Sequence, residues 1–169
     1  MQPSIAGERS PTDEQLIYIG SPLGRIAIRG NADFITAVLF ADGEQEDVVT
    51  PNASPLLYTA AQQLEEYFTK QRKMFDLPLQ QPGTAFQQLV WRNLLTIPFG
   101  ETITYLALAK RVGNVKSIRA VGTTNGKNAL SIIVPCHRVI GSNGVLTGYA
   151  GGLWRKQWLL DHEKGGLLF

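Results

Sequence analysis

The feature that most constrains the fold is a change of hydrophobic pattern at residues 80–83, a Gln-Gln-Pro-Gly stretch that predicts a loop. Before this loop, turn residues separate three short segments rich in β-branched residues, followed by a stretch with helical spacing. This predicts an antiparallel meander over residues 16–19, 25–29 and 34–40, then a helix over residues 54–70. After the loop, apolar residues recur every three or four positions, which is typical of helices. We therefore expect an α/β N-terminal domain over residues 1–80 and a mostly α C-terminal domain over residues 84–169.

Capping residues mark the helices expected in the second half. Thr84, with Gln87 three residues later, has the spacing of a capping box, so a helix should begin there. Thr104 is the expected cap of the next helix, and Gly113 should end it. Two further helices are expected, over residues 117–125 and 153–164. Two short helices joined by a glycine-containing turn, with basic residues at the start of the second, predict a helix-turn-helix.

Residues 131–140 carry the strongest chemical signal, because they contain the only cysteine of the chain. The Ile-Ile-Val run at residues 132–134 predicts a buried extended segment, which Pro135 then interrupts. Cys136 follows at this break, next to His137, where a basic neighbour favours a reactive thiolate. The alternative is an inert buried cysteine, a frequent role of a single thiol. In an extended segment the two side chains would point to opposite faces, so adjacency alone predicts no contact.

The net charge of +2 conceals an uneven distribution. Residues 1–83 contain 6 Lys and Arg and 11 Asp and Glu, a balance of −5. Residues 84–169 contain 10 Lys and Arg and 3 Asp and Glu, a balance of +7. An acidic half joined to a basic half indicates that the second half meets a polyanion such as a nucleic acid. The alternative is a solvated basic face without a partner.

Composition argues against several other classes of function. With one cysteine, neither an intramolecular disulfide nor a multi-cysteine zinc site can form, and two distant histidines argue against a histidine metal site. The glycines near residue 150 do not stand between a strand and a helix in the dinucleotide-binding order, so no nucleotide cofactor is expected. The chain shows neither an apolar run of membrane-spanning length nor a signal peptide. We therefore expect a cytoplasmic protein with no membrane partner.

The segment Pro135-Cys136-His137-Arg138-Val139 resembles the signature of the O6-alkylguanine-DNA alkyltransferases. Further motifs stand in that family's order and at its spacing: Arg119-Ala-Val-Gly122, Asn128, Gly148-Tyr-Ala-Gly-Gly152 and Trp158-Leu-Leu-Asp-His-Glu163. The resemblance is strong over residues 84–169. It covers the N-terminal half in outline, where it implies a ribonuclease-H-like scaffold.

The resemblance implies DNA repair by direct reversal of damage. The alkyl group of O6-alkylguanine would pass irreversibly to Cys136, and transfer from O4-alkylthymine is left open. Each molecule would then act once, as a stoichiometric reagent that needs no cofactor or metal. The partner would be double-stranded DNA containing the alkylated base, bound by a monomer; cooperative binding along the DNA is left open.

The same resemblance implies the roles of individual residues. His137 would act as the base through a bridging water, Glu163 would orient His137, and Asn128 would hold the active-site turn. Tyr105 would protonate or hydrogen-bond the leaving guanine. The expected substrate pocket comprises Tyr105, Val134, Pro135, Cys136, Val139, Tyr149, Ala150 and Gly151.

The resemblance also implies that the target base is flipped out of the duplex, because a stacked base is out of reach of a side-chain nucleophile. Arg119, in the second helix of the helix-turn-helix, would fill the gap that the base leaves. This helix would dock in the minor groove. Further DNA contacts are expected from Lys110, Arg111, Lys116, Ser117, Thr123, Lys127 and Arg138.

The sequence departs from the family pattern in two places, and two other functions stay open. Ala129 stands where the family usually has proline, and the link over residues 114–117 also lacks one; both bear on DNA affinity rather than on the chemistry. One other function is that of an alkyltransferase-like protein that recognises damage without repairing it. Cys136 argues against this, because those relatives replace the cysteine. The other is a thiol hydrolase that uses Cys136 and His137 and turns over repeatedly.

Overall fold

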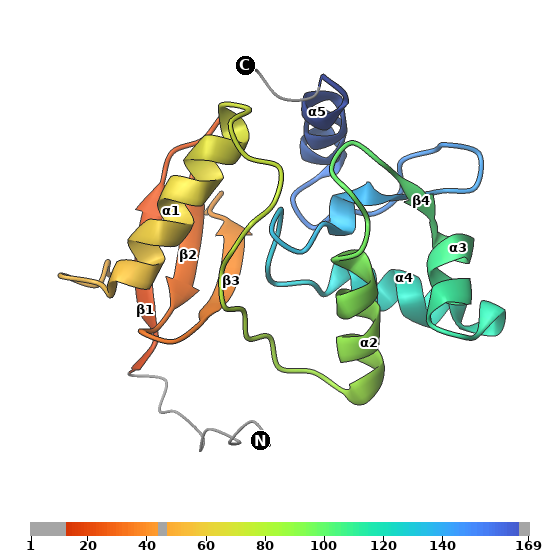
Figure 1. The fold of residues 1–169 in the computed structure, drawn as a ribbon, viewed down its shortest axis with the longest axis horizontal. Helices are drawn as coiled ribbons and strands as arrows, with labels where there is room; N and C mark the ends of the chain where they lie inside the picture. The colour runs from red at the N-terminus through yellow and green to blue at the C-terminus, as the bar shows by residue number, and fades with distance from the viewer. Residues whose placement is uncertain (1–12, 44–46, 166–169) are drawn as a thin grey trace.

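The computed structural model describes residues 13–43 and 47–165. Its N-terminal half is a three-stranded antiparallel sheet with one helix packed against it (Figure 1). The strands are β1 (Gln15–Ile19), β2 (Ile26–Gly30) and β3 (Ile35–Phe40), in the order β1-β2-β3, and the helix is α1 (Pro55–Phe68). The predicted meander and helix are confirmed, with small shifts at their ends.

Side-chain alternation along the strands builds the core of this half. Ile17 pairs with Ile28, and Ile28 pairs with Val38 on the neighbouring strand. All three side chains are buried in one hydrophobic cluster with the apolar side of α1, since alternate residues of a strand share one face of the sheet. The buried residues of α1 are Leu57, Ala60, Gln63, Leu64 and Tyr67.

The C-terminal half is mostly helical. Its helices are α2 (Ala85–Leu94), α3 (Tyr105–Arg111), α4 (Ile118–Gly126) and α5 (Leu153–Lys164), with a 3-10 turn, η2 (Val115–Ser117), between α3 and α4. The predicted capping box at α2 is confirmed: the Gln87 N–H donates to Thr84 Oγ1 (3.1 Å), and the Thr84 N–H donates to Gln87 Oε1 (2.9 Å). Thr104 caps α3 as predicted, and Gly113 follows its end with φ of +96°. The helix-turn-helix outline therefore corresponds to α3, η2 and α4.

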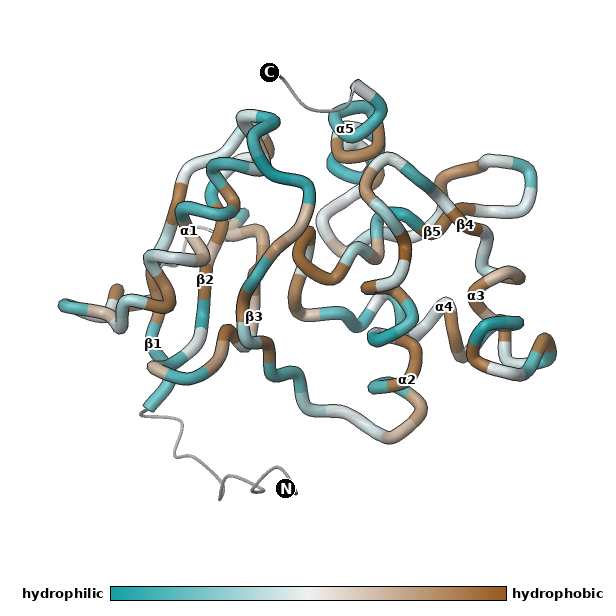
Figure 2. Tube along the Cα trace, viewed as in Figure 1, coloured by the Kyte–Doolittle hydropathy of each residue, from teal (hydrophilic) through white to brown (hydrophobic). Residues whose placement is uncertain are grey.

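The two halves share one hydrophobic core, and β3 lies where they meet. The Val38 N–H donates to Ala129 O (2.8 Å), and the Ser131 N–H donates to Val38 O (3.1 Å). The segment that follows α4 therefore runs beside β3, and Figure 2 shows its hydrophobic stretch there. The fold class is confirmed, while the domain boundary at residues 80–84 stays a prediction.

The segment over residues 131–134 is buried as predicted, but the prediction that it is extended is wrong. It forms consecutive turns, in which Ile132 has φ of +72° and the Ile133 N–H donates to Ser131 O (2.8 Å). An apolar β-branched run does not by itself distinguish a strand from another buried segment. A positive φ is costly for a β-branched residue, so the surrounding packing must hold Ile132 in place.

The segment ends in a short 3-10 turn, η3 (Cys136–Arg138), which leads directly into β5 (Val139–Ile140). β5 pairs in parallel with β4 (Ile103–Thr104), the strand that leads into α3. This pairing places the cysteine segment next to the start of the helix-turn-helix. In the part of the chain that the structure describes, no helix combines the length and apolar character needed to cross a membrane.

Candidate active site

Cys136 is held at the start of η3 by the backbone and by two asparagines. Its carbonyl accepts a hydrogen bond from Asn125 Nδ2 (3.2 Å), and its side chain is 5% exposed. Burial raises the pKa of the thiol, while a hydrogen bond from Asn128 and the positive charge of Lys156 act in the opposite direction. The thiol is therefore protonated at neutral pH, and its reaction as a nucleophile requires a base.

His137 is fully buried beside the carboxylate of Glu163 on α5. Its Nε2 lies 3.0 Å from Oε1 and 3.1 Å from Oε2 of Glu163. Burial lowers the pKa of His137 despite the opposing effect of the carboxylate, so the imidazole is neutral. Burial alone would raise the pKa of Glu163, but His137 and Arg138 together lower it, so the carboxyl group is ionised.

The neutral imidazole donates a hydrogen bond from Nε2 and keeps Nδ1 as an acceptor. Nδ1 is buried and has no hydrogen-bond partner among the described residues. Successive side chains in a 3-10 turn point about 120° apart. The prediction that Cys136 and His137 point to opposite faces is therefore wrong, and the reason is that η3 is not extended.

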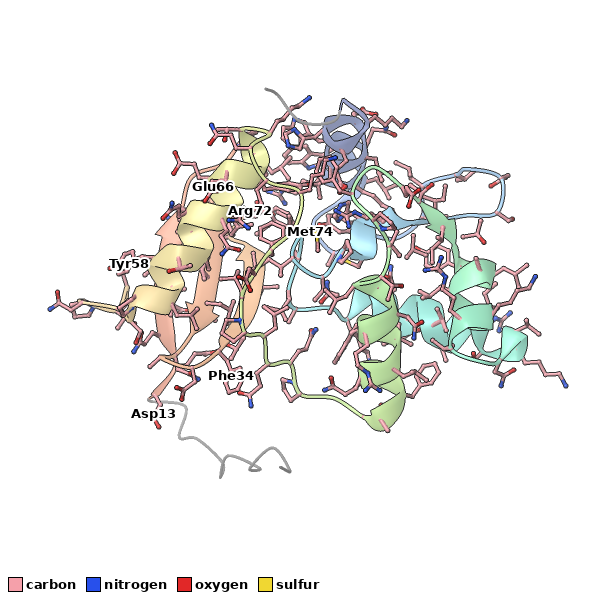
Figure 3. All side chains as sticks on the ribbon, in the orientation of Figure 1. Asp13, Phe34, Tyr58, Glu66, Arg72 and Met74 are labelled. Carbon is pink, nitrogen blue, oxygen red and sulfur yellow. The ribbon has the colours of Figure 1, made fainter. Side chains whose placement is uncertain are left out.

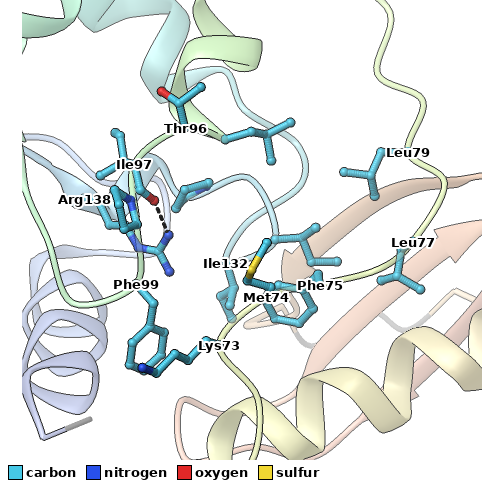
Figure 4. A pocket seen from close by; sticks show the side chains of 14 residues that line it. Lys73, Met74, Phe75, Leu77, Leu79, Thr96, Ile97, Phe99, Ile132 and Arg138 are labelled. Carbon is cyan, nitrogen blue, oxygen red and sulfur yellow. Dashed lines mark hydrogen bonds between the residues drawn. The ribbon is translucent and has the colours of Figure 1, made fainter. Parts of the chain in front are cut away.

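Arg138 does not point towards solvent. It is 6% exposed, its Nε donates to Glu163 Oε1 (2.7 Å), and its Nη1 donates to Ile97 O (2.7 Å) (Figure 4). The prediction that Arg138 contacts DNA is wrong, because its guanidinium is buried and neutralises the carboxylate that His137 uses. Arg138 also lines a cavity of about 480 Å³ where the two halves meet, together with Pro135 and mostly apolar side chains (Figure 4).

Asn128 holds the turn that precedes the cysteine. Its Nδ2 donates to Val134 O (2.9 Å), and its Oδ1 accepts from the Leu130 N–H (3.1 Å). Gln81, from the loop between the two halves, donates to the same Oδ1 (3.1 Å). The amide of Asn128 therefore bridges both ends of this turn, as a residue that fixes the turn should.

A pocket of about 450 Å³ lies between the helix-turn-helix and the loop over residues 147–152; we call it the α3–α4 pocket. Its lining includes Tyr105, Arg119, Asn125, Thr147 and Tyr149. Two residues of the predicted substrate pocket, Tyr105 and Tyr149, thus lie together with Arg119, which was predicted to fill the gap left by the base. Asn125, which the sequence did not single out, connects this pocket to the carbonyl of Cys136.

Other residues of the predicted pocket lie elsewhere. Val139 is fully buried in β5, and Pro135 lines the cavity at the boundary of the two halves. The carbonyl of Val134 is occupied by Asn128, and that of Gly151 accepts from Arg155 (3.0 Å). The lining of the α3–α4 pocket includes none of these four, nor Cys136 and Ala150. Their predicted contacts with substrate stay predictions.

Lys156 is a residue of the site that the sequence reasoning missed. It is fully buried; its Nζ donates to Thr147 O (2.9 Å) and Gly148 O (3.4 Å) and lies 3.5 Å from the Tyr105 hydroxyl. Burial lowers the pKa of Lys156 to about 8, although the electrostatic interaction with Cys136 acts to raise it. Lys156 precedes Glu163 by two helical turns, so the two residues share a face of α5. This spacing from Glu163 is the feature of the sequence that could have identified Lys156 as a site residue.

The remaining residues predicted to contact DNA lie on the outer side of α3, η2 and α4. The exposed ones are Lys110, Arg111, Lys116, Arg119, Thr123 and Lys127. Ser117 is half-buried, and its hydroxyl donates to Asn114 O (2.6 Å). Among the described residues, no group of three or more His, Cys, Asp or Glu side chains is placed to hold a metal ion.

Comparison with known protein families gives matches to both halves of the chain. The model of the ribonuclease-like domain of 6-O-methylguanine DNA methyltransferase matches residues 16–81. The model of the DNA binding domain of the same protein matches residues 85–165.

Individual relatives agree with the family models. The methylated-DNA–protein-cysteine methyltransferase of Methanosarcina acetivorans is 46% identical over 147 residues, which cover 85% of this chain and 94% of the relative. The constitutive enzyme of that name from Bacillus subtilis is 46% identical over 154 residues, covering 85% of this chain and 92% of the relative.

Solved structures show the same likeness. The crystal structure of Mycobacterium tuberculosis O6-methylguanine methyltransferase has a TM-score of 0.83 at 41% identity, covering 92% of this chain and 95% of the other. The structure of the same organism's OGT in complex with DNA has a TM-score of 0.82 at 42% identity, covering 89% and 93%.

Proposed function

This chain belongs to the family of methylated-DNA–protein-cysteine methyltransferases, and we propose that Cys136 is the cysteine that takes the alkyl group. Its function is DNA repair by transfer of an alkyl group from DNA to the protein itself. One observation carries the assignment to Cys136. The chain has one cysteine, and the next residue is a neutral imidazole whose Nε2 is fixed by Glu163 and whose Nδ1 is a buried acceptor without a partner among the described residues.

The substrate of this transfer is O6-alkylguanine in double-stranded DNA. The proton of the Cys136 thiol passes through a bridging water to Nδ1 of His137, and the Glu163 carboxylate stabilises the resulting imidazolium. The thiolate attacks the alkyl carbon, the bond from that carbon to O6 breaks, and the electron pair stays with the guanine. Because the product is a thioether with no leaving group, each molecule reacts once.

The departing guanine gains negative charge and needs a proton donor. The hydroxyl of Tyr105 faces the α3–α4 pocket, where it donates to Thr147 O (3.0 Å) and lies beside the Lys156 ammonium. In the reaction this hydroxyl turns to the base and supplies the proton.

DNA binding requires the target base to leave the duplex. Arg119 supports this step, because it is exposed on α4 and also lines the pocket that would receive the base. A guanidinium can stack on the remaining bases and attract phosphate. We place α4 in the minor groove, with the lysines of α3 and η2 on the phosphates. The protein acts as a cytoplasmic monomer, without a metal or cofactor.

The two alternative functions are less favoured. A damage-recognition protein would need no thiol, yet Cys136 is embedded in a site that activates it. A thiol hydrolase would use the same Cys and His but would not need the exposed basic residues on α3, η2 and α4. The family names of the relatives also favour alkyl transfer.

The test is to mix excess protein with a short duplex that carries one O6-methylguanine, and to weigh the tryptic peptide over residues 128–138. We expect one added methyl group on Cys136 and restored guanine, and no second turnover when the duplex is instead in excess. Cys136→Ser is the matched control and should bind the duplex without accepting the methyl group. Tight binding by the natural chain without transfer would point to a damage sensor instead. If the natural chain neither binds the duplex nor accepts the methyl group, the proposal is excluded.

A further inference from the structure

The first turn of α5 joins the active site to the N-terminal half. Arg155 lies there and is 4% exposed. Its Nε donates to the carbonyl of Leu23, in the turn between β1 and β2 (2.9 Å). Its Nη1 and Nη2 donate to the two carboxylate oxygens of Asp42, which follows β3 (2.7 and 2.5 Å). This bidentate ion pair therefore fixes α5 against the end of the sheet.

The same guanidinium holds the loop over residues 147–152. Its Nη1 also donates to Gly151 O (3.0 Å), and its Cζ lies 4.3 Å from the ring centroid of Phe40, the last residue of β3. Gly151 is packed so tightly that a Cβ there would lie 2.6 Å from the Phe40 ring and 3.1 Å from Cδ of Arg155. The loop is therefore seated on the end of β3, at a position that the guanidinium helps to set.

Tyr149 extends this contact to the substrate pocket. Its ring meets Phe40 edge to face, with centroids 6.2 Å apart, and it lines the α3–α4 pocket. A continuous series of contacts thus runs from Asp42 through Arg155 and Phe40 to the wall of the pocket. No described residue of the N-terminal half lines this pocket itself.

We propose that Arg155 and Asp42 are positioning residues for alkyl transfer, which fix the wall of the substrate pocket. Through this pair the N-terminal half determines which alkylated bases fit beside Cys136. The inference rests on the proposed function of Cys136 and the α3–α4 pocket. Loss of the pair leaves the thiol, its base and the DNA-facing residues in place but frees the loop that carries Tyr149. A looser wall holds a small alkyl group less well and excludes a large one less strictly.

The test is Asp42→Ala. Because the Asp42 side chain is 64% exposed, water can take its place beside the Arg155 guanidinium, so the variant should fold. Single-turnover transfer is measured with duplexes that carry O6-methylguanine or O6-benzylguanine, using the rate constant of the active fraction. We expect the methyl rate to fall by about three- to tenfold, because small displacements at a reacting centre are costly. The benzyl rate should fall less, so the ratio of benzyl to methyl rates rises. Affinity for an undamaged duplex should stay unchanged.

The matched control is Asp47→Ala. Like Asp42, Asp47 lies in the N-terminal half and pairs with an arginine: its Oδ2 is 2.5 Å from Nη2 of Arg29. Both rates and their ratio should stay unchanged in this variant. The proposal is overturned if Asp42→Ala leaves the methyl rate unchanged. It is also overturned if the ratio of benzyl to methyl rates stays unchanged, even where the melting temperature falls. If the natural chain transfers neither alkyl group to Cys136, the proposed function itself fails, which is a distinguishable result.

Discussion

His137 and Arg138 are neighbours in the chain that share the single carboxylate of Glu163. The hydrogen bond from His137 and the positive charge of Arg138 together keep this carboxylate ionised in a buried site. The histidine then stays neutral and uses the carboxylate to fix its tautomer. Sequence reasoning identified the pairing of His137 with Glu163 through resemblance. It assigned Arg138 to DNA, because a buried arginine cannot be told from an exposed one without the fold.

Glu163→Gln should therefore damage both catalysis and stability. The variant removes the charge that orients His137, so we expect the methyl-transfer rate constant to fall by about 10²-fold. It also leaves Arg138 buried without a counter-ion, which should cost about 3–5 kcal/mol of unfolding free energy. Single-turnover kinetics and urea unfolding measure the two effects.

The matched control is Glu66→Gln, which weakens a partly exposed ion pair with Arg72 (3.5 Å; both residues are labelled in Figure 3). Such pairs contribute about 0–1 kcal/mol, so this variant should keep the natural rate and most of the stability. Equal losses in the two variants would contradict the special role of the buried carboxylate.

Lys156 predicts a particular dependence of stability on pH. Its pKa is about 8 in the folded protein, below the ordinary value of 10.5, because the ammonium is buried. Between these values the unfolded chain binds the proton more strongly than the folded one, so stability rises with pH. The destabilisation is fully present below pH 8 and is relieved towards pH 10.5. Lys156→Met lacks this group, so the natural chain should gain stability relative to the variant across that window. The unfolding free energy of both chains is measured with urea at each pH. A difference between them that stays constant across this window would refute the assignment.

At the scale of elements, the parts specified by local sequence were predictable. The caps at Thr84 and Thr104 follow from short-range rules, since each cap bonds within three residues. The turns over residues 131–134 were not predictable. Their backbone bonds go partly to β3, and the positive φ of Ile132 is imposed by packing rather than by residue type.

In the candidate site, too, the residues in local motifs were predictable and those that depend on the fold were not. Residues in the family motifs were singled out from the sequence, but Lys156 and Arg155 were missed. Their roles depend on contacts that only the fold creates, with Tyr105 for Lys156 and with Asp42 for Arg155. The pocket wall was predicted only in part, because its members come from separate segments that only the fold brings together.

The cap of α3 should matter for chemistry as well as for stability. Thr104 Oγ1 accepts from the Ala107 N–H (3.0 Å) at the helix start that carries Tyr105. Thr104→Ala should cost about 1 kcal/mol of unfolding free energy, as should Thr84→Ala at α2. Only Thr104→Ala should also slow methyl transfer, because fraying of the first turn of α3 moves the Tyr105 hydroxyl. Equal transfer rates in both variants would show that the cap acts on stability alone.

At the scale of the whole molecule, the uneven charge of the sequence becomes a distribution in space. Three of the ten basic residues of the second half, Arg138, Arg155 and Lys156, are buried and used inside the protein. The charge that DNA can meet is therefore smaller than the count suggests. It is concentrated on α3, on η2 and at the two ends of α4, at Lys110, Arg111, Lys116, Arg119 and Lys127.

This distribution predicts how salt should affect DNA binding. Each phosphate that the protein neutralises releases counterions, so the logarithm of the affinity falls with the logarithm of salt concentration by about 0.9 per contact. Lys116→Ala removes an exposed charge from η2 and should make this slope shallower by about that amount. Lys164→Ala removes an exposed charge at the far end of α5, away from the helix-turn-helix, and should leave the slope unchanged (Figure 1). Titrations of an undamaged duplex at several salt concentrations measure both. Equal slopes in the two variants would mean that the DNA does not lie along η2, and the docking face would then have to be sought elsewhere on the basic half.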